Sequence, residues 1–194
     1  MKWNHAVAIA AALAIAALPL HASDYTQAPG STLAFGGTYQ GEAFAGRFPE
    51  FATTLSFDPA DLSTARLDVS IDLASATTAN ADYDAEMLGA SFLDSARFPT
   101  ATYRATAFRA LGGNRYVADG ILSLHGVEQP VALEFTWTPG PRPLLAGRAT
   151  VRRLAFGVGT GDWADTSLIP TETERGAVDN QRRIFGGFEP ILDQ

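Results

Sequence analysis

Alternation between apolar and polar residues is the strongest signal along this chain. In residues 65–73, alanine, leucine, valine and isoleucine occupy every second position, with arginine, aspartate and serine between them. The same period of two recurs at 51–57, 116–124 and 131–137. Because successive side chains of a strand point to opposite faces, each segment is predicted to be an antiparallel strand with one buried face.

Turn-forming residues separate these strands. Glycine, proline, asparagine and aspartate gather at 58–61, 111–114, 125–130 and 139–141. Such clusters are typical of short turns between strands. The chain is therefore predicted to be an antiparallel meander.

A meander with one apolar face can form a two-layer sandwich or a closed barrel, and the alternation alone fits both. A barrel of about eight strands removes both sheet edges and leaves an interior wide enough for one small ligand. We expect the barrel.

One segment departs from the period of two and predicts a short helix that ends before Phe98. Asn80 is suited to cap its start, because its side chain can accept hydrogen bonds from the first free backbone amides. Carboxylates near that start favour the positive end of the helix dipole. These carboxylates are Asp82, Asp84 and Glu86.

The predicted helix has an apolar face, and we expect it to cover the mouth of the barrel. The apolar residues of this segment are Tyr83, Met87, Leu88 and, beyond Gly89, Phe92.

The first 22 residues have the features of a secretory signal peptide. Lys2 supplies a positive charge, residues 6–18 are apolar, and Pro19 follows. The apolar run is shorter than the ~20 residues that span a bilayer, which favours cleavage over an uncleaved anchor. We expect cleavage after Ala22 and a periplasmic protein.

Composition narrows the class of partner. The chain has no cysteine, so no disulfide or cysteine ligand is available. It carries 21 acidic and 14 basic residues, a net charge of -7 that becomes -8 once Lys2 is removed with the leader. This acidity speaks against nucleic acid as a partner and against stable adsorption to anionic lipid. Stable membrane insertion is not expected either, because no segment after Ala22 could cross a bilayer as a helix.

Residues for catalysis are scarce. His5 and His21 belong to the leader, so His125 is the single histidine of the predicted mature chain. A Ser-His-Asp triad would need His125, but the chain lacks the Gly-x-Ser-x-Gly motif, and His125 falls in a predicted turn. The carboxylates 82–86 are explained as capping residues. We therefore predict no catalytic residue, no metal site and no cofactor.

Two other motifs receive structural interpretations. Residues 157–161 are rich in glycine but lack the Lys-Ser/Thr of a phosphate-binding loop, so we interpret them as a bend at a barrel corner. The pair Arg152 and Arg153 is suited either to an anionic headgroup or to an exposed strand end, and we favour the strand end.

Taken in order, several segments resemble the YceI family of lipocalin-like polyisoprenoid-binding proteins. No single motif is specific, but the ordered set covers most of the chain. The resembling segments are 31–35, 45–48, 55–59, 69–72, 75–78, 92–94, 98–99, 120–127, 130–131 and 153–159.

The resemblance implies an extended eight-stranded antiparallel barrel with a helical insertion, in which the lumen holds an isoprenoid lipid such as a polyprenyl chain or a quinone. It implies binding, transport or storage in the periplasm without catalysis. Inward positions of the predicted strands, with three residues near the mouth, are then the lipid-binding candidates. They are Phe35, Phe48, Leu55, Leu67, Val69, Ile71, Met87, Leu88, Phe92, Leu122, Leu133, Phe135 and Phe156.

The chain departs from the family pattern at two places. Tyr83 stands where an arginine is more usual. The barrel domain is expected at 23–170, and the family normally ends in an alternating strand, whereas residues 171–194 form an atypical tail rich in charge and glycine. Whether this tail supplies the closing strand is left open by the sequence.

Two rival functions and the oligomeric state, a dimer included, also stay open. A periplasmic hydrolase using the same cavity would need His125 or two carboxylates pointing inward. An outer-membrane barrel would need apolar residues facing lipid and a polar interior, against which the charged alternate positions speak.

Overall fold

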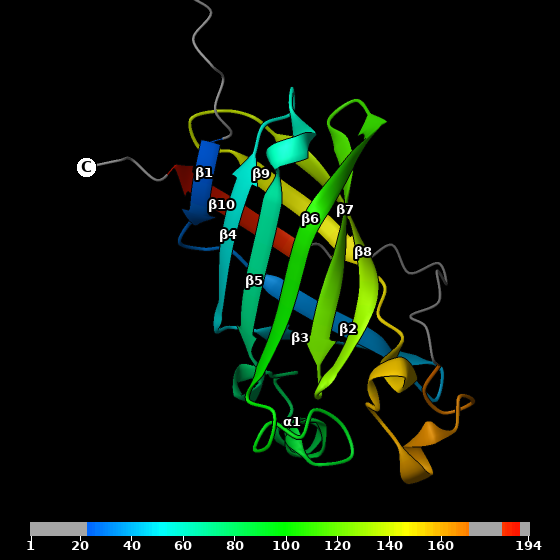
Figure 1. Cartoon of the computed structure of the whole chain (residues 1–194). Coiled ribbons are helices and arrows are strands. Elements are labelled where there is room, and N and C mark those ends of the chain that lie inside the picture. Colours follow the sequence, from blue (N-terminus) through cyan, green and yellow to red (C-terminus); the bar gives the residue numbers. More distant parts are fainter. Residues whose placement is uncertain (1–22, 171–183, 191–194) are drawn as a thin grey trace, which may run out of the picture.

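Eight strands form a closed barrel in the computed structural model, which describes residues 23–170 and 184–190 (Figure 1). The order around the barrel is β1-β10-β9-β8-β7-β6-β5-β4, and β4 pairs back with β1. Every pairing is antiparallel. The barrel strands are β1 (Ser23–Gln27), β4 (Phe51–Phe57), β5 (Arg66–Asp72), β6 (Thr100–Gly112), β7 (Arg115–Leu124), β8 (Val127–Thr138), β9 (Leu144–Ala149) and β10 (Ile184–Pro190).

This architecture confirms the predicted barrel and excludes the sandwich, because the sheet has no edge at β1 or β4. It also answers the question of the closing strand. Strand β10 lies between β9 and β1 and pairs with both, with Ile184 opposite Gly147 and Phe188 opposite Gln27. The tail therefore contributes a barrel strand beyond residue 170.

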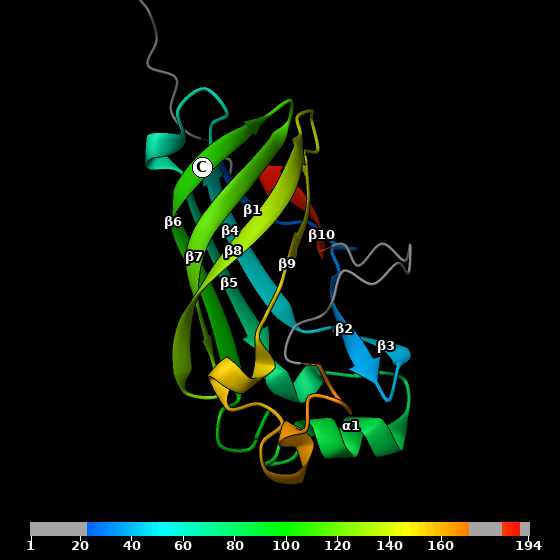
Figure 2. The same cartoon turned by 90° about the vertical axis from the view of Figure 1, so that its right-hand side faces the viewer.

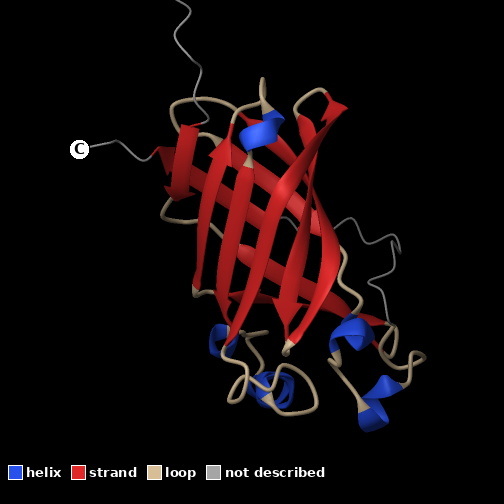
Figure 3. Ribbon diagram, in the orientation of Figure 1, coloured by secondary structure: helices blue, strands red, loops and turns tan. Residues whose placement is uncertain are grey.

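The other elements lie mostly at one end of the barrel (Figures 2 and 3). A hairpin of β2 (Leu33–Tyr39) and β3 (Glu42–Phe48) forms a separate two-stranded sheet. We call the end that carries α1 (Ala81–Leu88) the helix end, and the opposite end, with the connections 58–65, 113–114 and 139–143, the turn end. The remaining helices are the 3-10 turns η1 (Leu62–Thr64), η2 (Leu73–Ser75), η3 (Arg153–Phe156) and η4 (Gly161–Ala164).

Helix α1 begins where the sequence predicts. The Asn80 side chain accepts hydrogen bonds from the backbone amides of Asp82 at 3.0 Å and Tyr83 at 3.3 Å. These bonds satisfy two amides that have no partner within the helix. The expectation for Tyr83 was wrong: its side chain is 54% exposed and does not share the covered face of Met87 and Leu88.

A β-bulge in β6 changes which residues point inward. The register with β7 shifts between Ala105 and Ala107, so Thr106 is an extra residue on β6. A bulge of this kind bends its strand and changes the phase of the alternation. Tyr103 and Ala105 face the interior before the bulge, and Phe108 faces it afterwards.

Two predicted segments have a different local structure. Residues 125–130 were expected to form one turn, but only His125 and Gly126 do, and β8 already begins at Val127. Arg152 and Arg153 were expected at the end of a strand, but Arg153 begins η3. Gly157 then ends η3 with a φ of 70°, a left-handed conformation that suits glycine.

Within residues 23–170 and 184–190, no helix is both long and apolar enough to cross a membrane.

Candidate functional site

Aromatic side chains fill the barrel at its turn end. The ring of Phe57, 1% exposed, lies 5.1 Å from that of Tyr116, 5.6 Å from that of Phe135 and 5.2 Å from that of Trp137, measured between centroids. Edge-on contacts of this kind stabilise packed aromatic groups. We call this group the aromatic plug; its members are Tyr25, Phe57, Phe108, Tyr116, Phe135 and Trp137.

Inward side chains become progressively more exposed toward the helix end. On β8 the inward residues Leu133, Phe135 and Trp137 are buried, whereas Val127, Gln129 and Val131 are half-buried. Strands β4 and β5 have the same gradient along their inward positions. The half-buried part of β8, from 127 to 131, corresponds to about 13 Å of strand. The barrel is therefore plugged at one end and reachable by solvent in its other half.

The inward positions of the strands whose side chains the structure describes carry no charge. On β4, β5, β7, β8 and β9 every second residue points into the barrel. The first inward residue is Phe51 on β4, Leu67 on β5, Tyr116 on β7, Val127 on β8 and Leu145 on β9. Within the part of the chain that the structure describes, no inward strand position of β1 or β4–β9 is Asp, Glu, Lys, Arg or His. The interior is thus suited to apolar matter.

A second apolar cluster lies at the helix end. Its buried members are Leu73, Ala76, Leu93 and Ala101. The covered face of α1 and the hairpin β2–β3 pack on this cluster, and the rings of Phe35 and Phe48 lie 4.8 Å apart. The mouth of the barrel is therefore lined by side chains from elements outside the ring.

The predicted site residues divide between these two clusters. In the barrel cluster Val69 and Phe92 are partly buried, and six are buried: Leu55, Leu67, Leu122, Leu133, Phe135 and Phe156. The other five pack at the helix end: Phe35, Phe48, Ile71, Met87 and Leu88. Phe35 and Phe48 belong to the small sheet instead of the barrel wall, because hydrophobic alternation does not reveal which sheet a strand joins.

Sequence reasoning missed several lining residues. Phe57, Tyr116 and Trp137 follow the same alternation as the named candidates and were within reach of the same signal. The polar inward residue Gln27 carries no apolar signal, so only the strand register reveals it. Thr53 already falls on the inward face of the alternation at 51–57, but it was not named as a candidate because it is polar.

The Asp84 carboxylate fastens α1 to the preceding loop. It accepts hydrogen bonds from the Thr78 hydroxyl at 2.6 Å, the Thr78 amide at 2.6 Å and the Thr77 hydroxyl at 2.7 Å. These bonds, those of the Thr78 hydroxyl first, lower the pKa of Asp84 because they favour its charged form. Thr77 in turn pairs with Arg47 of β3, so Asp84 connects α1 to the hairpin.

The Arg153 guanidinium organises the segment that covers one side of the helix end. It donates to the carbonyls of Gly159 at 2.7 Å, Ile169 at 2.6 Å, Val158 at 3.2 Å and Pro170 at 3.4 Å. Burial lowers the pKa of Arg153. Arg153 is thus neither an exposed strand end nor a free headgroup-binding cation, which corrects the sequence-based interpretation.

His125 lies at the rim, in the turn between β7 and β8. Its Nδ1 is 3.2 Å from the Phe156 carbonyl oxygen, and its ring centroid is 4.9 Å from that of Phe98. Nδ1 therefore carries the proton and donates it to that carbonyl. No hydrogen bond joins His125 to a carboxylate among the described residues, so the histidine holds η3 in place and forms no triad there.

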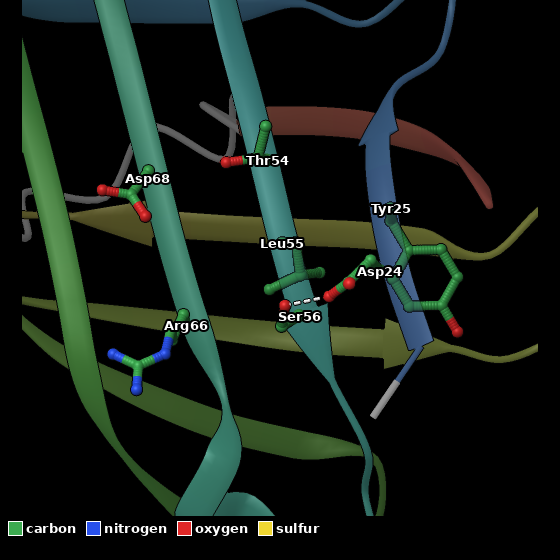
Figure 4. Close-up of a pocket in the computed structure, with 7 residues that line it drawn as sticks. All are labelled: Asp24, Tyr25, Thr54, Leu55, Ser56, Arg66 and Asp68. Atoms are coloured by element: carbon green, nitrogen blue, oxygen red, sulfur yellow. Dashed lines mark hydrogen bonds between the residues drawn. The ribbon is translucent and has the colours of Figure 1, made fainter. Parts of the chain in front are cut away.

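Two hollows lie on the outer wall and do not belong to the lumen. The first, of about 200 Å³, is formed by β1, β4 and β5, and there the Ser56 hydroxyl donates to Asp24 (Figure 4). The second, of about 430 Å³, lies beside the bulge, at Thr106 and Ile121. Among the described residues, no group of three or more His, Asp or Glu side chains is arranged to hold a metal ion.

Comparisons with known proteins agree with this architecture. The chain is 28% identical over 182 residues to a UPF0312 protein of Vibrio cholerae, an alignment that covers 86% of this chain and 95% of the relative. It is 32% identical over 132 residues to a UPF0312 protein of Vibrio parahaemolyticus, covering 64% of this chain and 70% of the relative.

Solved structures share the fold. BcnA of Burkholderia cenocepacia has a TM-score of 0.71 at 28% identity, and the match covers 81% of this chain and 94% of that one. A polyisoprenoid binding domain from Saccharophagus degradans, implicated in plant cell wall breakdown, has a TM-score of 0.57 at 17% identity, covering 87% and 97% of the two chains. The model of the YceI-like domain matches residues 25–175, so the chain belongs to the YceI family.

Proposed function

We propose that this protein binds a long isoprenoid lipid in the half-open lumen of its barrel and carries or stores it without catalysis. The observation that supports this most is the gradient along β8, in which inward residues change from buried at Trp137 to half-buried at Val127. A tube that is solid at one end and uncharged along its wall suits a hydrocarbon chain inserted from the other end.

The energetics of such a site need no polar contact. Burial of hydrocarbon contributes about 0.8 kcal/mol per CH₂ group. A few isoprene units therefore supply enough free energy for stable binding, provided that the wall is apolar. The Saccharophagus degradans domain of the same fold is named for this ligand class, and we extend that class to this chain.

The rival function, a hydrolase in the same cavity, finds less support. It needs an inward histidine or a pair of inward carboxylates, whereas the inward strand positions described above are uncharged. His125 donates to a backbone carbonyl at the rim and is not aligned with a nucleophile there. Binding is thus the function that the described residues favour.

We also infer that the protein works in the periplasm after residues 1–22 are removed. The acidic surface of the predicted mature chain would keep such a carrier soluble and away from anionic headgroups. Expression of the full chain in a Gram-negative host and mass measurement of the periplasmic product test this. We expect a chain beginning at Ser23, and an uncleaved chain in the membrane fraction would contradict it.

The ligand is tested by organic extraction of the folded protein purified from that host, followed by mass spectrometry. We expect a long isoprenoid to co-purify. Val69→Asp places a charge on the half-buried inner face of β5 and should abolish co-purification, whereas Ser70→Asp, on the exposed outer face of the same strand, should not. Repeated extraction of correctly folded wild-type protein without lipid would contradict the proposal.

A further inference from the structure

Gln27 presents an unpaired polar atom on the inner face of the barrel. On β1 the residues Tyr25 and Gln27 are half-buried, while Asp24 and Thr26 are exposed. Tyr25 packs on the barrel cluster, so Gln27, two positions further, faces the same interior. Its Oε1 is buried and has no hydrogen-bond partner among the described residues. Such an atom needs a donor, because an unpaired buried acceptor is costly.

Thr53 lies beside Gln27 on the neighbouring strand. Thr26 pairs with Thr54, so one step further in the antiparallel register sets Gln27 opposite Thr53. Thr53 pairs on its other side with the inward residue Val69, and both are half-buried. The register therefore places an amide and a hydroxyl side by side on the half-buried part of the wall.

This polar pair adjoins the base of the aromatic plug. The ring of Tyr25, next above Gln27 on the inner face, lies 5.3 Å from the ring of Trp137. The other inward amide is Gln129 on β8, and it already has a partner, because its Nε2 lies 3.5 Å from the Ala155 carbonyl oxygen. Of the two inward amides on the described strand positions, Gln27 is thus the one with unused hydrogen-bonding capacity.

We propose that Gln27 and Thr53 form a subsite for the headgroup of a neutral, hydroxyl-bearing isoprenoid. The lipid enters headgroup first and lies with its hydrocarbon chain toward the helix end. This inference rests on the proposed function and adds to it the chemical class and the orientation of the ligand. A hydroxyl suits the pair because it donates to Gln27 Oε1 and accepts from Thr53.

A charged headgroup does not suit this place. A phosphate buried in the lumen would need a cation, and the described inward strand positions include no lysine or arginine. An ion desolvated without a partner is strongly disfavoured. The subsite therefore selects against prenyl phosphates.

The subsite is tested with three ligands that share one chain: farnesol, farnesyl methyl ether and farnesyl phosphate. Calorimetric titration of the delipidated protein gives each Kd. We expect farnesol to bind about tenfold more tightly than the ether, the value of one hydrogen bond whose loss leaves Gln27 unpaired. The phosphate should bind more weakly than either.

Variants assign the difference to the named side chains. Gln27→Met keeps the length of the side chain and should make farnesol and its ether bind alike, and Gln27→Leu should do the same if the first variant fails to fold. Thr53→Val removes the hydroxyl that donates to the oxygen of both ligands, so it should weaken both and keep the preference. Thr26→Val, on the outer face of the same strand, should keep the preference. A preference that persists in a folded Gln27 variant, or binding of farnesol to Thr53→Val as tight as to the wild type, would overturn the subsite.

Failure of the subsite is distinguishable from failure of the proposed function. Equal affinity of the wild-type protein for farnesol and its ether would overturn the subsite and leave lipid binding intact. Binding of none of the three ligands would contradict both. A dye on the hydroxyl end should prevent binding and a dye on the opposite end should not; the reverse result would overturn the headgroup-first orientation.

Discussion

The phenol ring of Tyr103 lies across Gly120 on the inner face of the barrel. A Cβ added at Gly120 would come within 2.6 Å of Tyr103 Cζ and within 2.6 Å of the Arg104 carbonyl oxygen. The ring occupies the space that the glycine leaves, and its hydroxyl donates to the Ala118 carbonyl at 2.8 Å. Two residues on neighbouring strands therefore fill one position of the wall together.

Gly120→Ala should destabilise the barrel because the backbone of Arg104 cannot move aside as a flexible side chain can. Overpacking of this kind costs about 1–3 kcal/mol. Urea unfolding followed by tryptophan fluorescence measures the loss. Ser123→Ala, on the outer face of β7, is the control and should be close to neutral; equal stability of Gly120→Ala and wild type would contradict the close contact.

Stability should decline at alkaline pH through Tyr103. Burial, with the charge of Asp119 second, raises the pKa of the Tyr103 phenol above its ordinary value. Because the pKa of Tyr103 is higher in the folded than in the unfolded protein, its contribution to the free energy of unfolding is complete below the unfolded-state pKa of about 10. That contribution is lost as the pH rises above this value. Tyr103→Phe should flatten the dependence of unfolding free energy on pH above about 10. An unchanged slope would contradict this assignment.

At acid pH the corresponding group is Asp84. Its hydrogen bonds to Thr78 and Thr77 lower its pKa, so its contribution is present above the unfolded value and is lost as the pH falls through the folded one. Asp84→Asn should therefore be less stable than wild type at neutral pH, and the two should converge below about pH 4. Thermal unfolding across this range measures the difference, with Asp82→Asn as the matched control; a constant difference would refute the role of the charge.

Replacement of Arg153 should loosen one segment and spare the barrel. Arg153→Met keeps the apolar stem and removes the donors to the carbonyls of residues 158, 159, 169 and 170. Loss of about 1.5 kcal/mol of local stability would speed proteolytic cleavage within 157–170 about tenfold. Limited proteolysis with mass spectrometry measures this. Arg142→Met, an exposed arginine at the turn end, serves as the control, and equal cleavage of the two variants would contradict the expectation.

The plug should depend on Phe57 more than on other rings of the same strand. Phe57→Ala removes a ring that is 1% exposed and should lower the free energy of unfolding by about 3–5 kcal/mol. Phe51→Ala, at a half-buried position on the same face, should lower it distinctly less. Denaturant unfolding of the two variants compares them. Equal losses would mean that the turn end is no more solidly packed than the helix end.

Strands that combine large apolar residues with charged alternates were predictable from the sequence. Residues 66–72 and 131–137 have this pattern, and both lie in barrel strands. Strand β6 was harder because small residues such as Ala101 and Ala105 occupy its inner face and Thr106 interrupts its period. Strand β10 was hidden by its glycines, since only its pairing with β9 and β1 defines it.

Proline was misleading at one place. Pro130 marked a turn in the sequence, yet it lies within β8, opposite Ile121. β8 pairs with β9 only from Leu133 onward, so near Pro130 it is an edge strand, where a residue without an N–H is tolerated. Pairing between distant segments decided this, and local pattern cannot reveal it. The same limit hid Gln27, whose inward position depends on the register with β4.

The seam of the ring joins the first and last strands of the described chain, since β1 pairs with both β4 and β10. The barrel can therefore close only when both β1 and β10 are available to pair. Contacts between segments so distant in sequence are slow to form. A chain truncated before residue 184 would lack β10 and would expose the unpaired edges of β9 and β1. Such edges recruit strands from other copies. Truncation at the C-terminus should thus lead to strand-swapped oligomers or polymers of the protein.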